Sequence, residues 1–443
     1  MNATFKCHET HFFVPHFLYK MYVSYIRYSI KSQTFFKNNF ILIIIAQFSY
    51  NSTDFLYFFT YLKCVILEQE RRDFKTMKTW QNELPFHPEN PITEALFSES
   101  SAFFDIETTG FSPTHTHVYL IGCAARKGNV VCTTQFFAEN PSEEKLILNA
   151  FSELLTHYNT LITFNGIGFD IPYLQGRYQY HKLPEPFSGF QYLDIYKSLA
   201  KYKHILKLEN LKQKTIEQFL NLHREDMYSG GELINVYDSY VKEPSDDALT
   251  LLRLHNYEDV TGMIDLLPVL SYVQLFDGNF EVTGFEKCSY EEYEGSPSLE
   301  LHLTLNTAFP LPKRFSFCLQ DIYLTGFQNQ VKLKVKIYQG ELKFFYSNYK
   351  DYYYLPKEDM AVHKSVAFYV DKNYRTRAKA ATCYSKKTGC FLPQFTEVFE
   401  PYFKLEYHDK VLYFEMTEDF TDSPEAQKKY CIHLLNHLLH TKI

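Results

Sequence analysis

The pattern of apolar and polar positions changes along the chain. Residues 99–272 combine short apolar runs with apolar residues at helical spacing. Short apolar runs bounded by turn residues are typical of strands, and apolar residues three or four apart are typical of helices. The short runs predict strands at 101–107, 117–125, 130–137 and 160–165. Longer periodic stretches predict helices at 142–158, from Pro172 onward and at 245–272, with Ser142 and Ser245 as N-caps. This alternation predicts an α/β fold with a mixed sheet flanked by helices.

A different pattern fills the chain after residue 273. Residues 298–306 and 330–338 alternate apolar and polar positions, and 341–349 is also typical of a strand. A periodic stretch at 423–440 predicts a closing helix. We therefore expect four parts: an N-terminal extension at 1–76, a lead-in at 77–98, an α/β domain at 99–272, and a mostly antiparallel, β-rich C-terminal module at 273–443.

The first 76 residues differ in composition from the rest. Residues 1–63 hold 18 aromatic residues, residues 1–53 hold five Lys or Arg against one acid, and the first glycine is Gly110. Phe, Tyr, Ile, Asn and Lys are what AT-rich non-coding DNA yields when it is translated. We interpret 1–76 as a non-native or disordered extension and expect the true start at Met77.

The composition, net charge and cysteine count exclude some classes of protein. A hydrophobic fraction of 45% with 22% charged residues is ordinary for a soluble chain, and a net charge of −7 excludes a wholly basic nucleic-acid binder. Nine cysteines with no CxxC spacing favour reduced thiols over disulfides or zinc. The longest apolar run, 40–46, is far below the ~20 residues of a spanning helix. We expect a cytoplasmic protein without a membrane partner.

Two acids directly follow an apolar run in the sequence SAFFDIETTGF. Asp105 and Glu107 are two residues apart, so on a strand they face the same side. Buried carboxylates are costly unless something neutralises them, and two like charges this close repel each other. The pair therefore indicates a bound cation.

Further acids occur where a fold can gather them around that pair. Asp170 follows the strand predicted at 160–165, and Asp259 lies on the long helix with His255 one turn before it. Oxygen ligands from several elements suit two Mg²⁺ or Mn²⁺ ions, which can serve an in-line phosphoryl displacement when roughly 3.5–4 Å apart. His255 could orient or deprotonate the attacking water.

The motifs DIETTGF, FNGIGFD and HNYED resemble, in order and spacing, the three exonuclease motifs of the DnaQ-type DEDD 3′–5′ exonucleases, whose fold is ribonuclease H-like. The intermediate blocks YLDIYKSL, LENLKQKTIEQFL and REDMYSGGELINVYDSY resemble the YprB-like ribonuclease H-like domain more closely. The resemblance covers about 99–272, which is under half of the chain.

The resemblance implies specific roles. The metal ligands would be Asp105, Glu107, Asp170 and Asp259, and the water-activating residue would be His255. Thr108, Asn165 and Phe169 would contact or shape the site of the terminal nucleotide. One departure concerns the spacing: the familiar subgroups place a Tyr four residues, or a His five residues, before the last acid, whereas His255 lies four before Asp259. Asp194, in YLDIY, is expected to make a structural hydrogen bond.

A basic segment lies inside the C-terminal module. Residues 361–387 carry seven Lys or Arg against one acid, with three tyrosines interleaved. Cations neutralise phosphates and aromatic rings stack on unpaired bases, so this segment is a candidate substrate-binding surface. The residues concerned include Lys364, Arg375, Arg377, Lys379, Lys386 and Lys387. The other interpretation, an ordinary solvated face, stays open.

The sequence thus predicts a metal-dependent 3′–5′ exonuclease acting on single-stranded nucleic acid through two divalent cations. Two alternatives remain: a non-catalytic nucleic-acid-binding protein with the same fold, and a structure-specific endonuclease. The residue pattern does not discriminate DNA from RNA, because recognition of the 2′-hydroxyl depends on the detail of the pocket. Protein partners are likewise not predicted.

Overall fold

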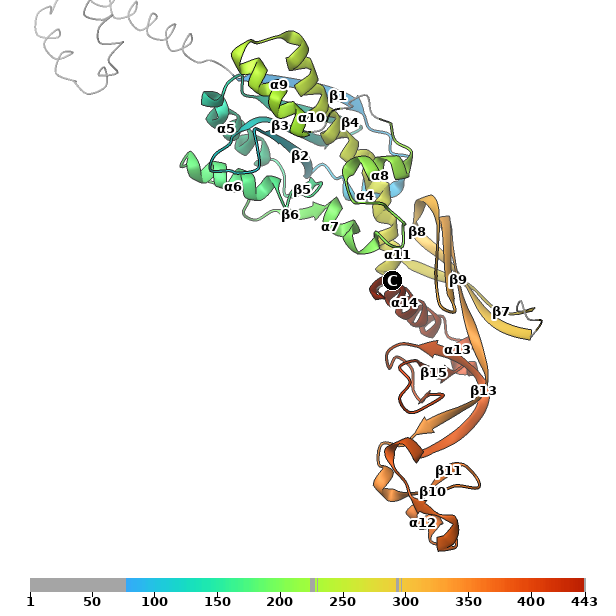
Figure 1. Ribbon diagram of the computed structural model, residues 1–443. Helices are drawn as coiled ribbons and strands as arrows, with labels where there is room; N and C mark the ends of the chain where they lie inside the picture. Colours follow the sequence, from blue (N-terminus) through green and yellow to red (C-terminus); the bar gives the residue numbers. More distant parts are fainter. Residues whose placement is uncertain (1–76, 224–227, 229, 292–294, 296, 442–443) are drawn as a thin grey trace, which may run out of the picture. The chain divides into compact units, whose positions relative to one another are not determined.

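The computed structural model describes residues 77–223, 228, 230–291, 295 and 297–441 (Figure 1). The extension predicted at 1–76 lies outside the described residues. Everything below therefore concerns the part of the chain that begins at Met77.

The first layer is a six-stranded sheet in the order β1-β4-β3-β2-β5-β6. The pairs β1–β4, β4–β3 and β3–β2 are antiparallel, whereas β5 pairs in parallel with both β2 and β6. Their bounds are β1 Lys78–Pro85, β2 Ser101–Thr108, β3 Val118–Lys127, β4 Val130–Phe137, β5 Thr160–Thr163 and β6 Gln191–Asp194. The predicted mixed sheet is confirmed, and β1 adds an edge strand from the segment expected to be a lead-in.

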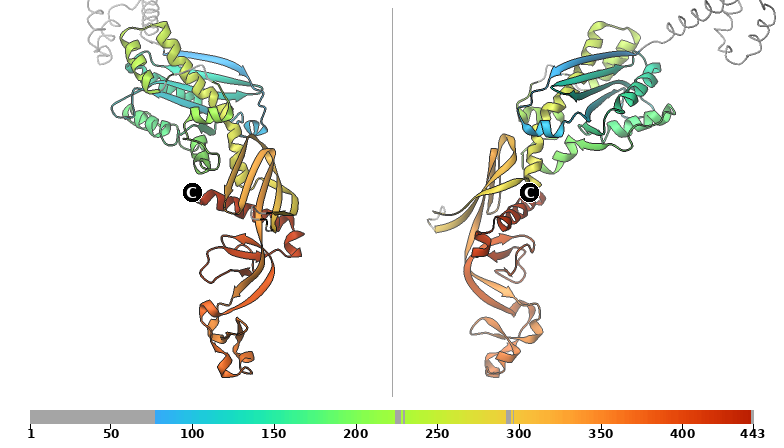
Figure 2. Two further views of the ribbon diagram at one scale, coloured as in Figure 1. Left: turned by 45° about the vertical axis from the view of Figure 1, so that its right-hand side comes forward. Right: turned by 180° about the vertical axis from the view of Figure 1, so that it is seen from behind.

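Helices cover both faces of this sheet (Figures 1 and 2). On one face, Phe104 of β2 packs in a core cluster with residues of α5 (Glu144–Leu155) and α6 (Asp170–Tyr180). On the other face, Phe103 shares a core cluster with Val260 of α10 (Asp246–Leu266). Because strand residues alternate, Asp105 and Glu107 face the same side as Phe103, which is the side of α10.

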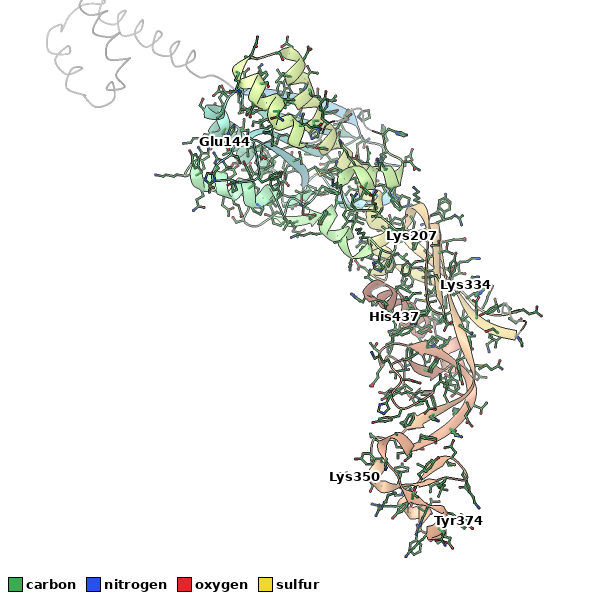
Figure 3. All side chains as sticks on the ribbon, viewed as in Figure 1. Glu144, Lys207, Lys334, Lys350, Tyr374 and His437 are labelled. Atoms are coloured by element: carbon green, nitrogen blue, oxygen red, sulfur yellow. The ribbon has the colours of Figure 1, made fainter. Side chains whose placement is uncertain are left out.

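The start of α5 differs from the expectation. Ser142 is not the N-cap: Asn140 caps a short 3-10 turn, and α5 begins at Glu144. The Glu144 side chain is instead buried, where it accepts hydrogen bonds from Arg177 Nε at 2.7 Å and from Val118 N at 2.8 Å (Figure 3). A buried carboxylate needs such partners, so this pair fixes α5 against α6 and β3.

The long helix predicted at 245–272 is confirmed with one interruption. Ser245 caps α10, which ends at Leu266, and a 3-10 turn over Leu267–Leu270 leads into α11 (Ser271–Phe276). Pro268 explains the break, because it has no N–H for the helical ladder. By length and composition this stretch could cross a membrane, but 61% of its most apolar window is buried inside the protein, as in a core helix.

Short helices complete this part of the chain. They are α4 (Pro91–Leu96), α7 (Ile195–Leu199), α8 (Gln213–Leu220) and α9 (Gly230–Lys242). Tyr237 of α9 stacks on Tyr119 of β3 with ring centroids 4.0 Å apart, so α9 shares the sheet face that α10 covers.

The C-terminal module is a six-stranded antiparallel sheet in the order β14-β15-β13-β9-β8-β7, which confirms the predicted class. Its strands are β7 Phe280–Glu291, β8 Pro297–Leu319, β9 Ile322–Phe345, β13 Tyr384–Gln394, β14 Tyr402–Phe403 and β15 Leu412–Glu415. The strands expected at 330–338 and 341–349 are largely one strand, β9. A three-stranded sheet joins β10 (Tyr352–Leu355) with β11 (Met360–His363) and β12 (Thr376–Arg377), next to α12 (Lys364–Ala367).

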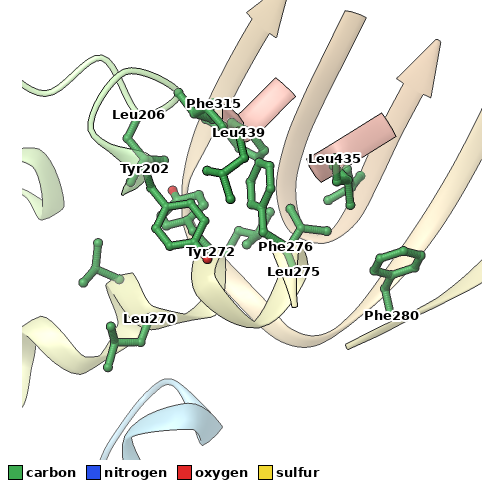
Figure 4. Packing of buried hydrophobic residues seen from close by; sticks show 14 of the residues in the cluster. Tyr202, Leu206, Leu270, Tyr272, Leu275, Phe276, Phe280, Phe315, Leu435 and Leu439 are labelled. Carbon is green, nitrogen blue, oxygen red and sulfur yellow. The ribbon is translucent and has the colours of Figure 1, made fainter. Parts of the chain in front are cut away.

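One core cluster runs from α11 into this module (Figure 4). Tyr272 contacts Phe315 of β8 with ring centroids 5.4 Å apart, and Leu439 of α14 (Pro424–His440) belongs to the same cluster. The Tyr272 hydroxyl donates to Lys313 O at 2.5 Å. The closing helix was predicted from its apolar periodicity, and the structure adds that it is part of the packed core; α13 (Glu418–Thr421) precedes it.

Candidate metal centre

The acids of β2 meet the helix that crosses them. Glu107 is buried, and its Oε1 lies 3.5 Å from Nε2 of His255. His255 and Asp259 are one turn apart on α10, and His255 Nε2 lies 3.1 Å from Asp259 Oδ2. One ligand atom from each of these three residues lies within 4.8 Å of the other two. The offset of four residues therefore places His255 and Asp259 on one face, both directed at Glu107.

Asp170 reaches the same place from the loop after β5. It is buried at the start of α6. Its carboxylate accepts hydrogen bonds from the backbone N–H groups of Asp170 itself and of Ile106. Ile106 lies between Asp105 and Glu107 on β2. Asp170 is therefore adjacent to the strand that carries the first two acids.

The loop that delivers Asp170 is held by Asp194. The Asp194 side chain accepts hydrogen bonds from Asn165 N and Ile167 N, both at 3.0 Å, and it also caps α7. Asn165 has a φ of 63°, in the left-handed region that Asn tolerates better than most residues. The expectation of a structural hydrogen bond for Asp194 is confirmed, because the residue fixes the turn between β5 and α6.

The electrostatics of the cluster are those of crowded negative charge. Burial raises the pKa of Asp105 well above its usual range, and the charges of Asp259, Asp170 and Glu107 raise it further. Burial likewise raises the pKa of Asp170 to about 7, with added contributions from Asp194 and Asp259. These shifts mean that the ionised forms are unfavourable in the protein alone, and a cation between the carboxylates would relieve them.

Three residues that the sequence reasoning missed support Asp105. Asn256 Nδ2 donates to Asp105 Oδ2 at 3.2 Å, and Asn256 Oδ1 accepts from Gln135 Nε2 at 3.0 Å. In the sheet, Gly122 of β3 pairs with Asp105 of β2 on one side and with Gln135 of β4 on the other. A Cβ at Gly122 would come within 2.1 Å of Asn256 Oδ1, so only glycine admits the amide. In the sequence only the position of Asn256 next to His255 hinted at this contact.

Aromatic side chains border the loop of the second motif. The ring of Phe169 lies 6.0 Å from that of Phe111, which is 84% exposed, and 5.6 Å from that of Tyr173. Thr108, at the end of β2, donates from Oγ1 to Gly110 O at 2.9 Å. Thr108, Asn165 and Phe169 thus lie on the two segments that also carry Glu107 and Asp170.

The basic residues predicted as substrate-binding belong to the C-terminal module, and several make ion pairs there. Lys364 contacts Asp351 at 2.8 Å, Lys386 contacts Asp359 at 2.6 Å, and Lys387 contacts Glu415 at 2.5 Å. These three charges are offset within the protein. Tyr384, one of the interleaved aromatics, is buried. The remaining predicted cations, which lie on the segment around β12, are Arg375, Arg377 and Lys379.

The donor set fits a hard divalent cation. Carboxylate oxygens from β2, α6 and α10 together with one imidazole are ligands that Mg²⁺ and Mn²⁺ accept, whereas the thiolates of a zinc or iron–sulfur site do not take part. The residues that would hold the ions are Asp105, Glu107, Asp170 and Asp259.

Comparison with known proteins agrees with this fold. Residues 102–271 match the family model RNase_H_2, described as RNase_H superfamily, in agreement with an RNase H-like fold for this part of the chain. No curated protein matches the sequence. The match ends at residue 271, so the β module lies outside it.

Solved structures of nucleic-acid enzymes are distantly similar. A family B DNA polymerase from the archaeon Pyrobaculum calidifontis is 17% identical over 40% of this chain and 25% of its own, with a TM-score of 0.32. Exonuclease I from E. coli with a dT13 oligonucleotide is 10% identical over 47% of this chain and 55% of its own, with a TM-score of 0.25. The chain thus spans a quarter to about half of these proteins, and likeness at this level adds nothing to an assignment of activity.

Proposed function

We propose that the protein is a metal-dependent 3′–5′ exonuclease that hydrolyses single-stranded nucleic acid. The observation that carries the proposal is the convergence of Glu107, His255 and Asp259 ligand atoms within 4.8 Å. Asp105 lies beside it, because Asn256, next to His255 on α10, donates to Asp105 Oδ2, and Asp170 is adjacent to β2. Burial and the neighbouring acids raise the pKa values of Asp105 and Asp170, and a bound cation would offset this negative charge. The match of residues 102–271 to the RNase_H_2 family supports a nuclease.

The proposed reaction breaks one phosphodiester bond. Water attacks the terminal phosphorus, the bond to the 3′-oxygen of the preceding nucleotide breaks, and a nucleoside 5′-monophosphate leaves while that oxygen takes up a proton. Two divalent cations, when bound, would supply positive charge for the phosphoryl transition state.

The protein residues have distinct tasks in this proposal. His255 would accept the proton of the attacking water through Nε2 once a bound cation draws away the Asp259 carboxylate, which lies 3.1 Å from that nitrogen. Asn256 holds the Asp105 carboxylate in place through its 3.2 Å hydrogen bond. We assign Thr108 and Phe169 to contacts with the last nucleotide, and Asn165, whose φ is 63°, to the turn before Phe169.

A direct test uses the full chain with 5′-labelled DNA and RNA strands in Mn²⁺. We expect a ladder that shortens stepwise from the 3′ end, with no products in chelator or with Asp105→Asn. A strand with a blocked 3′ end is the matched substrate control, and it should remain intact.

Other results would contradict the proposal in distinguishable ways. Internal cuts in the blocked strand would indicate an endonuclease with the same centre. Retention of the strand without any cleavage would indicate a non-catalytic binding protein. Hydrolysis that survives both chelator and Asp105→Asn would reject the metal centre itself.

A further inference from the structure

A second surface stands out in the small sheet of the C-terminal module. We call residues 364–379, which connect β11 to β12 and continue just past it, the aromatic loop. Within nine residues it exposes four large apolar side chains: Val366 at 57%, Phe368 at 74%, Tyr369 at 87% and Tyr374 at 50%. Exposed apolar residues are normally scattered singly, and a group of them marks a contact surface.

The fold of this region does not require these rings to be exposed. Its small core consists of Ala361, Ala378 and Cys383, packed against Tyr346, Tyr352 and Tyr354 of the neighbouring strands and loops. Phe368 and Tyr369 contact each other edge to face, with centroids 5.5 Å apart. The structural tyrosines are therefore a separate set from the exposed rings, and packing gives no reason for the latter.

Positive charge accompanies the exposed rings (Figure 3). The aromatic loop has five Lys or Arg against the single acid Asp371, in a chain of net charge −7, and of the five Lys364 is paired with Asp351. The guanidinium carbons of Arg375 and Arg377 lie 5.0 and 4.6 Å from the ring centre of Tyr353, and Lys357 Nζ lies 4.3 Å from that of Tyr374. Arg375 also donates to Ala367 O, which ties its guanidinium to the loop. The cations are thus held next to aromatic faces.

We propose that the aromatic loop binds single-stranded nucleic acid, with Phe368, Tyr369 and Tyr374 stacking on unpaired bases and Arg375 and Arg377 contacting phosphates. The proposal rests on the proposed function and adds to it a second substrate contact, which would retain a long strand during hydrolysis. Aromatic rings beside arginines favour a nucleic acid over a lipid surface. A single strand offers unpaired bases that stack on the rings and phosphates that the guanidinium groups bind. Lys386 and Lys387 are not part of the surface, because both are paired with acids.

The test measures binding separately from cleavage. The full chain carrying Asp105→Asn is titrated with a fluorescent strand of about thirty nucleotides. Adding Phe368→Ser and Tyr369→Ser should weaken binding at least about tenfold, because each stacked base contributes on that order. Tyr323→Ser is the matched control: it removes a 39%-exposed tyrosine on β9 and should leave binding unchanged.

The arginines give a second, independent readout. Arg375→Gln with Arg377→Gln should flatten the salt dependence of binding by roughly 1.4 in log–log slope, as expected for two phosphate contacts on a single strand. The Phe368 and Tyr369 substitutions should leave that slope unchanged. An unaltered slope in the arginine variant would overturn the phosphate contacts.

Failure of this proposal is distinguishable from failure of the proposed function. If the serine variants bind the strand as tightly as their parent, the aromatic loop is not a nucleic-acid surface, whatever the nuclease assay gives. The same conclusion follows if the substitutions abolish binding to anionic phospholipid vesicles but not to the strand. If strand binding falls as expected while the unsubstituted chain never cleaves, the inference about the loop stands and the nuclease proposal falls.

Discussion

Carboxylates in the two halves of this protein have opposite surroundings. In the RNase H-like domain, burial and three neighbouring acids raise the pKa of Asp105. In the C-terminal module, hydrogen bonds from Lys386, Tyr354 and Tyr384 hold the pKa of Asp359 well below its usual range. The module neutralises its acids with its own side chains. The acids of the centre lie close to one another instead, and a divalent cation would offset their charge.

The largest expected effect is on the hydrolysis rate, and it comes from removing an acid of the metal centre. Asp105→Asn should lower the hydrolysis rate about 10³-fold or more, because a lost ligand costs several kcal/mol of transition-state stabilisation. The same change should leave the melting temperature of the metal-free protein unchanged or higher, since it removes a repelling charge. Rates with labelled strands and thermal melts in chelator measure the two effects. A large loss of stability with intact activity would reverse the assignment.

A second experiment concerns Glu144, an acid of the RNase H-like domain that is paired with Arg177. Glu144→Gln should lower the free energy of unfolding by ~3–5 kcal/mol, because it leaves the buried Arg177 without its carboxylate. Chemical denaturation measures the change. The double variant Glu144→Gln, Arg177→Met is the control, and it should recover much of the loss. Equal stabilities of the single variant and the parent would show that the pair does not hold α5 to α6.

Substitution of His255 tests whether this residue transfers a proton while the acids bind the metal. His255→Gln should reduce the rate about 10²-fold, the usual range for removing a general base. Mn²⁺ affinity should fall much less than in Asp105→Asn, because the proposed ligands are the acids. Calorimetric titration of both variants makes the comparison. Equal losses of metal affinity would make His255 a ligand, and full activity would exclude it from the proton transfer.

The smallest effect is expected in the module. Asp359→Asn should lower stability by about 1 kcal/mol or less and leave hydrolysis unchanged, because Asp359 and Lys386 are partly exposed and their ion pair is screened by solvent. The difference should shrink in high salt. A loss of activity in this variant would connect the module to the metal centre, which the comparison of the two regions does not predict.

Much of the RNase H-like domain could be predicted from the sequence. The strands around Asp105 and Glu107 were clear because apolar runs ended at turn residues, and the four acids and His255 were identified by their motifs. The support of Asp105 by Gln135 and Asn256 could not be predicted. It depends on a helix crossing three strands more than a hundred positions away, and no local pattern reports such a contact.

For the C-terminal module, only the fold class, a mostly antiparallel sheet, could be predicted from the sequence. Alternation indicated antiparallel strands, but not that the strand expected at 330–338 continues to Phe345. The basic segment illustrates the same limit: its charges were visible, whereas the partners of Lys364, Lys386 and Lys387 come from acids brought together by the fold. The surface that we propose therefore rests on the exposed rings beside Arg375 and Arg377 rather than on charge alone.

Direct titration of the full chain with Mn²⁺ tests the central claim, that four distant carboxylates converge to bind divalent cations. We expect two ions per chain at pH 8 and weaker binding at pH 6, because Asp170, whose pKa is raised to about 7, must lose its proton to bind metal. Asp105→Asn should abolish binding of at least one ion. Absence of Mn²⁺ binding at pH 8, or binding that is the same in Asp105→Asn and in the parent, would contradict the account.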